Sequence, residues 1–359
     1  MDTSSQQQRI AKMTASPSET IMQALGRMDQ GGMGLALVCD ENHRLVGVIS
    51  DGDVRRAILK GMSLQEPCLT IASADPVVAL PSVKASEALR LMDSAKSFRV
   101  NHLPLVDQVG KLSGLVARRD LAPESEDLPL SVVLMAGGMG TRLMPLTKDV
   151  PKPMLPVGDR PLMEHTLNQL RQAGVRHVDI TTNYLAEKIQ QYFGDGKDFG
   201  VEISYVEEDR PLGTAGALGL IPPPSGPLLV INGDILTKID FRAMLEHHKK
   251  HHADLTIASR RHDFQVPYGV VDCDGPNVLD LREKPVLNFL INAGIYLMEP
   301  LVHQYIPAGQ RLDMTELVKL LLQQGRSVVS FPLVEYWLDV GQHQDYEQAQ
   351  ADAQHGVLG

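Results

Sequence analysis

The sequence has few cysteines and no long apolar run. Its three cysteines, Cys39, Cys68 and Cys273, lie too far apart for a metal-binding spacing or a disulfide framework, which is typical of a reducing cytoplasm. No apolar stretch approaches the roughly 18 residues needed to span a bilayer. Residues 1–8 also lack the basic and then apolar order of a signal peptide. We therefore expect a soluble cytoplasmic protein that makes no use of a membrane.

The sequence also lacks an excess of basic residues. It has 34 Lys and Arg against 44 Asp and Glu, which gives a net charge of −10. An acidic chain is a poor partner for nucleic acid, because neutralising phosphates requires a basic surface. Apolar residues make up 43% and charged residues 22%, which excludes wholesale disorder. The length of 359 residues predicts two domains, or three small ones.

An internal repeat occupies the first 120 residues. Residues 38–54 align without a gap on residues 105–121, at an offset of 120 − 53 = 67 residues. Each copy shows an apolar strand, a turn, a second strand closed by Asp, and a helix. A helical apolar pattern precedes each copy, with Ser18 and Ser86 as candidate N-caps. Because one copy of about 60 residues buries little core, we expect the two copies to pack as a pair.

The pattern changes after residue 121. Residues 122–129 are acidic, contain two prolines and have no periodicity, which indicates a linker. Strand, glycine turn and helix then alternate, with strands expected at 131–136, 178–182, 228–231 and 255–259 and a helix at 162–173. This alternation predicts an α/β domain with a mostly parallel sheet covered by helices on both faces. The predicted segments are 1–66 and 67–124 for the two copies, 125–130 for the linker and 131–359 for the second domain.

The strongest chemical signal is a glycine-rich loop directly after the strand at 131–136. It contains Gly137, Gly138, Gly140 and Arg142, and Lys152 follows between two prolines. Glycines at such a position let backbone N–H groups approach an anion, and a nearby cation neutralises its charge. Neither Gly-x-x-x-x-Gly-Lys-Ser/Thr nor Gly-x-Gly-x-x-Gly is present. The loop therefore predicts phosphate binding outside the two commonest phosphate motifs.

Residues 134–157 closely resemble the signature of the sugar-1-phosphate nucleotidylyltransferases, or nucleotide-sugar pyrophosphorylases. That signature is Leu-Ala-Gly-Gly-x-Gly-Thr-Arg-Leu-x-Pro-Leu-Thr followed by Pro-Lys-Pro-Met, and the inserted Met135 is the one departure. Further segments resemble the family up to Trp337–Gly341. The resemblance implies a Rossmann-like mixed-sheet domain. It also implies an enzyme that transfers a nucleoside monophosphate from a nucleoside triphosphate to a sugar-1-phosphate and releases pyrophosphate.

The same resemblance implies the site residues and a Mg²⁺ cofactor. The implied catalytic residues are Arg142, Lys152, Asp234 and Asp339, and the two aspartates are also the implied Mg²⁺ ligands. The implied nucleotide-binding residues are Leu134, Ala136, Gly137, Gly138, Gly140, Thr141, Glu207, Glu208, Gly213 and Thr214. The implied sugar-phosphate-binding residues are Tyr268, Gly269, Glu283, Lys284 and Asn292. These residue types suit the chemistry, because two polyanionic reactants need cations and Mg²⁺ prefers hard oxygen ligands.

Each of these residues has a purely structural alternative. Asp234 and Asp339 are also common turn residues, and Glu283–Lys284 alone would be an exposed ion pair. Their shared order along one chain favours the functional interpretation. The histidine-rich stretch 247–252 is interpreted as a solvated helix end rather than as a metal site.

The base and the sugar are less sharply indicated. Glu207–Glu208 followed by Leu212–Gly216 resembles the mannose-1-phosphate guanylyltransferase branch, and a carboxylate can accept hydrogen bonds from the N1–H and the exocyclic amine of guanine. GTP is therefore favoured, with mannose-1-phosphate or glucosamine-1-phosphate as the second substrate. Two alternatives stay open. One is a dTTP- or UTP-using glucose-1-phosphate nucleotidylyltransferase, and the other is a nucleotide-sensing regulatory subunit with an inactive transferase domain.

The repeat has a resemblance of its own. Gly47–Asp53 resembles the signature of a CBS (cystathionine-β-synthase-type) motif, which implies that Ser50, Asp53 and Asp120 hold the ribose of an adenine nucleotide. The second copy has Ala117 where the hydroxyl belongs. The structural alternative is that both aspartates only cap the following helices. Since CBS pairs commonly dimerise, the resemblance also implies a homodimer or higher homo-oligomer formed in part through residues 10–121.

Overall fold

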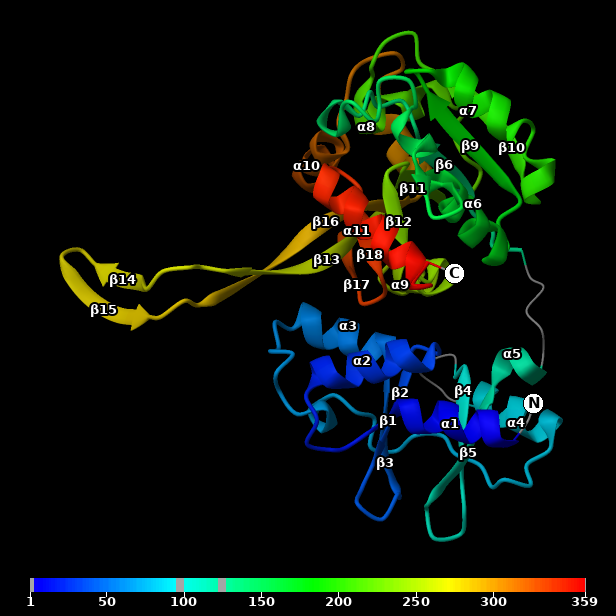
Figure 1. The fold of residues 1–359 in the computed structure, drawn as a ribbon, viewed down its shortest axis with the longest axis vertical. Helices are drawn as coiled ribbons and strands as arrows, with labels where there is room; N and C mark the ends of the chain where they lie inside the picture. The colour runs from blue at the N-terminus through cyan, green and yellow to red at the C-terminus, as the bar shows by residue number, and fades with distance from the viewer. Residues whose placement is uncertain (1–2, 95–99, 122–126, 359) are drawn as a thin grey trace. The chain divides into compact units, whose positions relative to one another are not determined.

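The computed structural model describes residues 3–94, 100–121 and 127–358. The chain divides into two compact units, residues 1–125 and residues 126–359 (Figure 1). Of the predicted linker at 125–130, residues 125 and 126 lie outside the described residues, as do residues 122–124 of the second repeat copy. None of the helices in the described ranges combines the length and apolarity that crossing a bilayer requires.

The first unit contains the two repeat copies. Its helices are α1 (Thr3–Met13), α2 (Ile21–Gly31), α3 (Asp51–Leu59), η1 (Cys68–Thr70), α4 (Ala85–Asp93) and α5 (Arg118–Leu121). Its strands are β1 (Thr14–Ala15), β2 (Leu35–Cys39), β3 (Leu45–Ser50), β4 (His102–Val106) and β5 (Leu112–Ala117), in the sheets β1-β2-β3 and β4-β5. Two 3.0 Å bonds join the hairpin turns of the copies, from Leu45 N to Gly110 O and from Leu112 N to His43 O. Leu37 of the first copy shares a buried cluster with Leu115 of the second. The two copies therefore pack as a pair, as expected.

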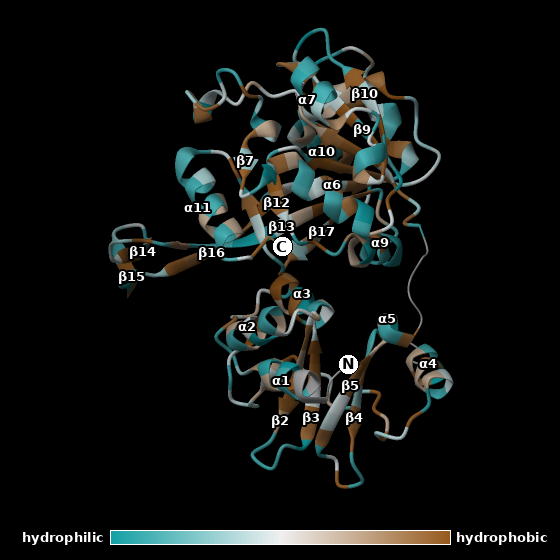
Figure 2. Ribbon diagram, turned by 45° about the vertical axis from the view of Figure 1, so that its right-hand side comes forward, coloured by the Kyte–Doolittle hydropathy of each residue, from teal (hydrophilic) through white to brown (hydrophobic). Residues whose placement is uncertain are grey.

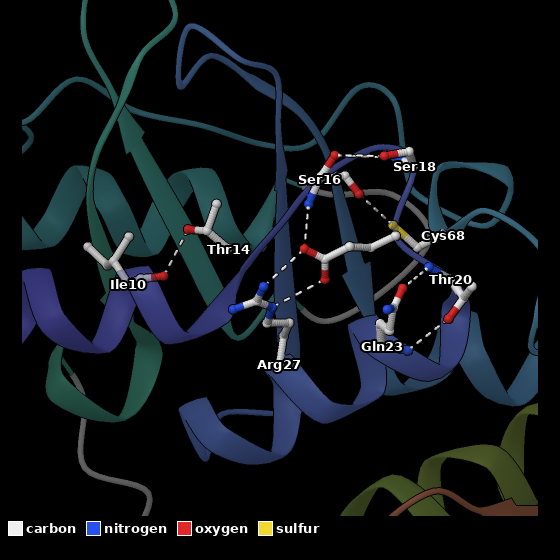
Figure 3. Close-up of polar contacts among 9 residues, drawn as sticks. Ile10, Thr14, Ser16, Ser18, Thr20, Gln23, Arg27 and Cys68 are labelled. Carbon is white, nitrogen blue, oxygen red and sulfur yellow. Dashed lines mark hydrogen bonds and ion pairs between the residues drawn. The ribbon is translucent and has the colours of Figure 1, made fainter.

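The helix caps differ from the prediction. Thr20, not Ser18, caps α2: its Oγ1 accepts from the Gln23 N–H at 3.2 Å, and its own N–H donates to Gln23 Oε1 at 2.8 Å (Figure 3). Ser18 lies in the preceding turn, where its hydroxyl is 3.1 Å from the hydroxyl of Ser16. Ser86 lies inside the first turn of α4, whose N-cap is Lys84. The Gln three residues after Thr20 completes a capping box, and a search for Ser alone misses that signal.

The second unit is built on a seven-stranded mixed sheet in the order β10-β9-β6-β11-β16-β13-β17. Its strands are β6 (Ser131–Met135), β9 (His177–Thr182), β10 (Glu202–Glu207), β11 (Leu228–Asn232), β13 (Leu255–Gln265), β16 (Val286–Met298) and β17 (Val328–Leu333). Strands β10, β9, β6 and β11 are parallel to one another, and β16 runs antiparallel to both of its neighbours. The predicted α/β class is confirmed, and the predicted strands lie within one residue of the observed ones, except that β13 continues to Gln265.

Two apolar cores cover the two faces of this sheet. The alternation of a strand sends Leu134 to one core and Val133 to the other, and Ile231 and Val230 divide in the same way. The first core also holds side chains of α6 (Leu162–Gln172), α7 (Ala186–Phe193) and α9 (Phe241–Lys250), and the second holds those of α8 (Gly213–Gly216), η5 (Ala217–Leu220), η6 (Pro300–Tyr305) and α10 (Met314–Gln323). Helices on both faces leave the strand ends as the accessible edge of the sheet.

Short elements complete the second unit. The strand pairs are β7 (Pro156–Val157) with β8 (Arg160–Pro161), β12 (Ile235–Thr237) with β18 (Trp337–Asp339), and β14 (Val270–Asp274) with β15 (Asn277–Arg282). The remaining helices are η2 (Thr141–Leu143), η3 (Lys152–Met154), η4 (Lys197–Phe199) and α11 (His343–Gln354). The outer halves of β13 and β16, together with β14 and β15, extend from the sheet as a two-stranded arm, residues 261–290 (Figure 1).

The interpretation of 247–252 as a solvated helix end was wrong for His248. Its side chain is fully buried, with Nδ1 2.7 Å from Thr256 Oγ1 and Nε2 3.2 Å from Glu299 Oε1. No cluster of three or more His, Cys, Asp or Glu suited to a metal is found in the described ranges. Burial lowers the pKa of His248, although the carboxylates of Glu299 and Asp254 oppose that shift.

This buried histidine predicts an acid-sensitive fold. The folded-state pKa of His248 lies below its unfolded value of about 6.5, so below that pH the unfolded chain binds more protons and stability falls. We expect the melting temperature of the second unit to drop between pH 7.5 and pH 5.5, and His248→Gln to show a smaller drop. His251→Gln, on the exposed end of the same helix, is the matched control and should follow the wild type. An identical pH dependence in His248→Gln would contradict this assignment.

Candidate active site

A pocket of about 230 Å³ opens where parallel strands of the second unit end. Its walls are the segment after β6, the segment after β11, part of η3 and the segment after β10. The lining residues are Met135, Ala136, Gly137, Gly138, Lys152, Pro153, Glu208, Pro211, Gly213, Thr214, Asn232, Gly233 and Asp234. In open α/β sheets, ligands bind in the crevice outside the carboxyl ends of the strands, and this pocket lies there.

The glycine loop after β6 fits this place for steric reasons. A Cβ on Gly137 would lie 2.5 Å from Glu208 Oε1, so any larger residue here would require the Glu208 side chain to move. Gly140 has a φ of +61°, and its carbonyl accepts from the Thr147 hydroxyl at 2.9 Å. Gly138 has open space around it and lines the pocket. The loop therefore exposes backbone to the pocket at 137–138 and turns sharply at 140.

Lys152 and Asp234 meet at the floor of the pocket. Lys152 is only 8% exposed, and its Nζ lies 2.5 Å from Asp234 Oδ2. Lys152 belongs to η3 and Asp234 follows β11, 82 residues later. A buried lysine is retained where its charge is paired, and this pairing holds an ammonium group at the pocket wall.

Asp339 lies beside Asp234 because β12 and β18 pair. Their register places Ile235 opposite Asp339, and Val340 N donates to Asp234 O at 3.0 Å. Asp339 Oδ1 is buried and has no hydrogen-bond partner among the described residues. Burial and the neighbouring Asp234 raise the pKa of Asp339, while the charges of Lys152 and Arg142 oppose the rise.

Arg142 approaches the same group from the glycine loop. A Cβ on Gly341 would meet Asp339 Oδ1 at 3.4 Å and Arg142 Nη1 at 3.6 Å, so the three residues converge at one point. The structure thus brings together all four residues to which the resemblance assigns catalysis. Asp345, near the start of α11, is a further carboxylate here and also raises the pKa of Asp339. Sequence reasoning did not single out Asp345, because a helix-start Asp carries no functional signal by itself.

The two adjacent glutamates have different environments. Glu207 ends β10 and is exposed, whereas Glu208 is buried and lines the pocket. Leu212 N–H donates to Glu208 Oε2 at 3.0 Å, and Asn183 Nδ2 donates to Glu208 O at 2.7 Å. Burial raises the pKa of Glu208, opposed by the hydrogen bond from Leu212. Of the pair, Glu208 is the carboxylate that lines the pocket.

Only some of the remaining predicted nucleotide-binding residues line the pocket. Ala136, Gly213 and Thr214 line the pocket, and Thr214 Oγ1 also accepts from Met314 N at 2.8 Å. Thr141 is exposed on η2. Leu134 does not line the pocket: its side chain is fully buried in the first core, because residues alternate along β6. Asn232 does line it, although it was not among the predicted site residues, and its buried Oδ1 has no hydrogen-bond partner within the described part of the chain.

The predicted sugar-phosphate residues are not brought to the pocket. Tyr268, Gly269, Glu283 and Lys284 are exposed residues of the arm, and none of them lines the pocket. Asn292 lies at the base of the arm, where its Nδ2 donates to the Tyr296 hydroxyl at 2.6 Å. None of this set therefore lines the pocket that the predicted catalytic residues Lys152 and Asp234 line.

In the first unit, Ser50 and Asp53, two of the three residues predicted to bind an adenine nucleotide, take part in helix capping. Asp53 Oδ2 accepts from both Ser50 N at 2.8 Å and Ser50 Oγ at 2.6 Å, and its Oδ1 pairs with Arg56. This geometry is the capping alternative for the first copy. Asp120 is an exposed residue of α5.

Comparisons with known proteins agree with both resemblances. Residues 131–356 match the nucleotidyl transferase family, and residues 11–60 and 70–126 match the CBS domain family. Mannose-1-phosphate guanyltransferase of Pichia angusta is 36% identical over 227 residues, which are 60% of this chain and 61% of that protein. UTP–glucose-1-phosphate uridylyltransferase of Synechocystis is 35% identical over 241 residues, which are 61% of this chain and 62% of that protein.

A solved structure is similar as well. A Bacillus anthracis protein assigned as a glucose-1-phosphate thymidylyltransferase superposes with a TM-score of 0.52 and 27% identity, covering 63% of this chain and 95% of that one. The chain spans less than two thirds of the length of the curated relatives named above, and its first unit lies outside the matched nucleotidyl transferase region. Since the family match covers residues 131–356, well over half of the sequence, this chain belongs to the nucleotidyl transferase family and carries a CBS domain pair before the family's domain.

Proposed function

We propose that this protein transfers a nucleoside monophosphate from a nucleoside triphosphate, preferably GTP, to mannose-1-phosphate or glucosamine-1-phosphate. The products are pyrophosphate and a nucleotide-diphospho-sugar. The observation that carries the proposal is the convergence of Lys152, Asp234, Asp339 and Arg142 beside a glycine loop at the carboxyl ends of parallel strands. This convergence also favours a working enzyme over a regulatory subunit with an inactive transferase domain.

The proposed reaction is an in-line displacement at phosphorus. An oxygen of the sugar-1-phosphate attacks the α-phosphorus, the bond from that phosphorus to the bridging oxygen breaks, and pyrophosphate leaves. Both reactants are polyanions, so the residues must offset their repulsion and hold them in line. The N–H groups of the loop at 137–138 and the Arg142 guanidinium would hold the triphosphate, and the Lys152 ammonium would lie at the reacting phosphates. The chain provides position and charge, and no side-chain nucleophile is required.

The aspartates suit a magnesium ion. Asp339 Oδ1 is buried and has no hydrogen-bond partner in the ranges that the structure describes. Burial beside Asp234 disfavours its ionised form, as expected of a carboxylate that awaits a cation. Asp234 and Asp339 would hold Mg²⁺ through hard oxygen ligands. When bound, the ion would neutralise phosphate charge.

The preference for guanine rests on Glu208. Its Oε2 is engaged by Leu212 N–H, while Oε1 lies beside Gly137 at the pocket wall. A carboxylate oxygen there can accept from the N1–H and exocyclic amine of guanine, whereas thymine and uracil present a single N–H on that edge. The guanylyltransferase names among the similar proteins point the same way, and the uridylyltransferase name keeps UTP as the competing base.

The CBS pair is proposed to bind an adenine nucleotide and to support a cytoplasmic homodimer. Binding at the first copy would require Asp53 to exchange a capping hydrogen bond with Ser50 for one with a ribose hydroxyl. The second copy lacks the equivalent hydroxyl at Ala117. The ligand would therefore be held mainly at the first copy.

Removal of either member of the buried ion pair tests the mechanism. Lys152→Ala and Asp234→Asn should each lower kcat for pyrophosphate release by at least about 100-fold, since each removes charge from the site of reaction. The exposed pair Lys197–Asp195, at 2.6 Å, is the matched control: Lys197→Ala and Asp195→Asn should leave kcat unchanged. Circular dichroism checks the fold. Near-normal turnover in either pocket variant would rule out this mechanism.

A substrate grid tests the base assignment. Pyrophosphate release is measured with GTP, UTP, dTTP, CTP and ATP against mannose-, glucose-, glucosamine- and N-acetylglucosamine-1-phosphate. We expect GTP to be strongest, and Glu208→Gln to lower kcat/KM for GTP by about 10- to 100-fold by leaving base donors unpaired. Glu202→Gln, at the exposed start of β10, is the control. A strong UTP or dTTP signal would support the proposed reaction type and refute the preference for GTP.

A thermal shift experiment tests the CBS site. AMP or ATP at about 100 times its Kd should stabilise the first unit by about 2.7 kcal/mol, and Asp53→Ala should remove that shift. Asp53→Ala also loses a cap, so Thr20→Ala serves as control: it breaks the capping box of α2 but should keep the nucleotide-induced shift. No shift with any adenine nucleotide would reduce the pair to a dimerisation module.

A further inference from the structure

The arm, residues 261–290, exposes many large apolar side chains. Nine large apolar side chains of the arm are exposed, at 45% to 75%. They are Phe264, Tyr268, Val271, Val278, Leu279, Leu281, Val286, Phe289 and Leu290. Figure 2 shows apolar stretches along β15 and the outer part of β16. The cores of the second unit that hold its other strands do not include these side chains.

The exposed residues are arranged as packing faces. Phe264 lies opposite Leu287 in the antiparallel ladder, and His262 lies opposite Phe289, so Phe264 and Phe289 occupy neighbouring positions on one face. Toward the tip, Val271 pairs with Leu281 in the same manner. Val278 and Leu279 are adjacent, as are Phe289 and Leu290, so both sides of the two-stranded arm carry exposed apolar side chains.

The area of the arm matches one side of a stable interface. Nine such side chains of about 150 Å² each, roughly half exposed, present on the order of 700 Å². A standard protein interface buries about 800 Å² per partner, and the two sides of the arm together approach that area. The arm is therefore large enough to pack against a second protein surface.

The arm also carries the residues that the pocket lacks. Tyr268, Glu283 and Lys284 are on the arm, and the pocket of the same chain is lined without them. The ladder from Arg261↔Leu290 to Gln265↔Val286 is unbroken, and Val266 N donates to Pro285 O at 3.0 Å beyond it. The ladder continues through Arg260↔Ile291 and Ser259↔Asn292 into the main sheet, so turning the arm onto its own pocket would break this pairing at the base, and a second copy is the better-suited acceptor.

Three exposed apolar side chains in and after the glycine loop offer such an arm a packing surface. Met139 lies within the glycine loop, Met144 and Leu146 follow it, and all three are exposed. Lys284 is a cation and suits a phosphate at the pocket edge. Exchange of an identical element between two copies is a common route to a closed, two-fold dimer.

We propose that two copies exchange arms. The arm of each copy packs beside the glycine loop of the other and places Tyr268, Glu283 and Lys284 at the partner's pocket, where they complete the sugar-phosphate site. This assignment rests on the proposed function for the identity of the ligand. The contact between copies stands on the arm's apolar faces alone.

Complementation between two inactive variants tests the exchange. Lys152→Ala damages the pocket and Lys284→Ala damages the arm, and the full-length variants are co-expressed with different affinity tags and purified through both. In an exchanged dimer one site combines an intact pocket with an intact arm, so we expect about half of the activity of the doubly tagged wild type. Full activity of Lys284→Ala alone, or a mixed species no more active than its parents, would overturn the proposal.

A second measurement does not depend on catalysis. If the doubly tagged wild type releases no pyrophosphate with any substrate, the proposed function fails, and the arm is judged by sedimentation of the full chain. Leu279→Ser/Leu281→Ser should raise the dimer dissociation constant at least about tenfold, because four apolar side chains per dimer lose burial. Leu301→Ser/Leu322→Ser, exposed outside the arm, should leave it unchanged. An arm variant with the wild-type dissociation constant would refute the contact.

Discussion

The ion pair between Lys152 and Asp234 is the interaction on which the site depends. It joins two segments 82 residues apart, and one of its members is almost completely buried. A buried ammonium without a partner would be strongly unfavourable, so the glycine loop, η3 and the end of β11 must hold one arrangement. That arrangement leaves Asp339, across the β12–β18 pair, with a buried oxygen that no group among the described residues hydrogen-bonds. The fold thus keeps opposite charges close together in a place suited to a polyphosphate.

The first unit uses similar chemistry for a different purpose. Ser50 and Asp53 bond to each other and close a capping box at the start of α3, and Thr20 and Gln23 do the same at α2. A motif that is shared with nucleotide-binding modules therefore also has a local structural use. The Asp53 carboxylate can serve in a cap or in ribose binding, because the N–H and hydroxyl groups at a helix cap and the hydroxyls of a ribose are all hydrogen-bond donors.

The arm shows where prediction of strands from hydrophobic periodicity stops working. The prediction ended a strand at Ser259, where the apolar run gives way to Arg260, Arg261 and His262. The structure continues β13 to Gln265 because β16 supplies a partner throughout. A strand held by backbone pairing and not yet covered by side chains has no single buried face, so its apolar residues do not follow the alternation on which a sequence-based prediction relies.

The sequence by itself determined the two-part organisation, the paired repeats, the α/β class and the family. These follow from local order, since repeats, strand–glycine–helix alternation and the loop at 136–142 are continuous in the chain. Only the tertiary structure decided that Glu208 and not Glu207 faces the pocket, that Leu134 belongs to the core, and that Tyr268 and Lys284 lie away from the pocket of their own chain. Which side of a strand a residue faces, and what a distant segment brings beside it, depend on packing partners far away in the sequence. The local sequence pattern does not identify these packing partners.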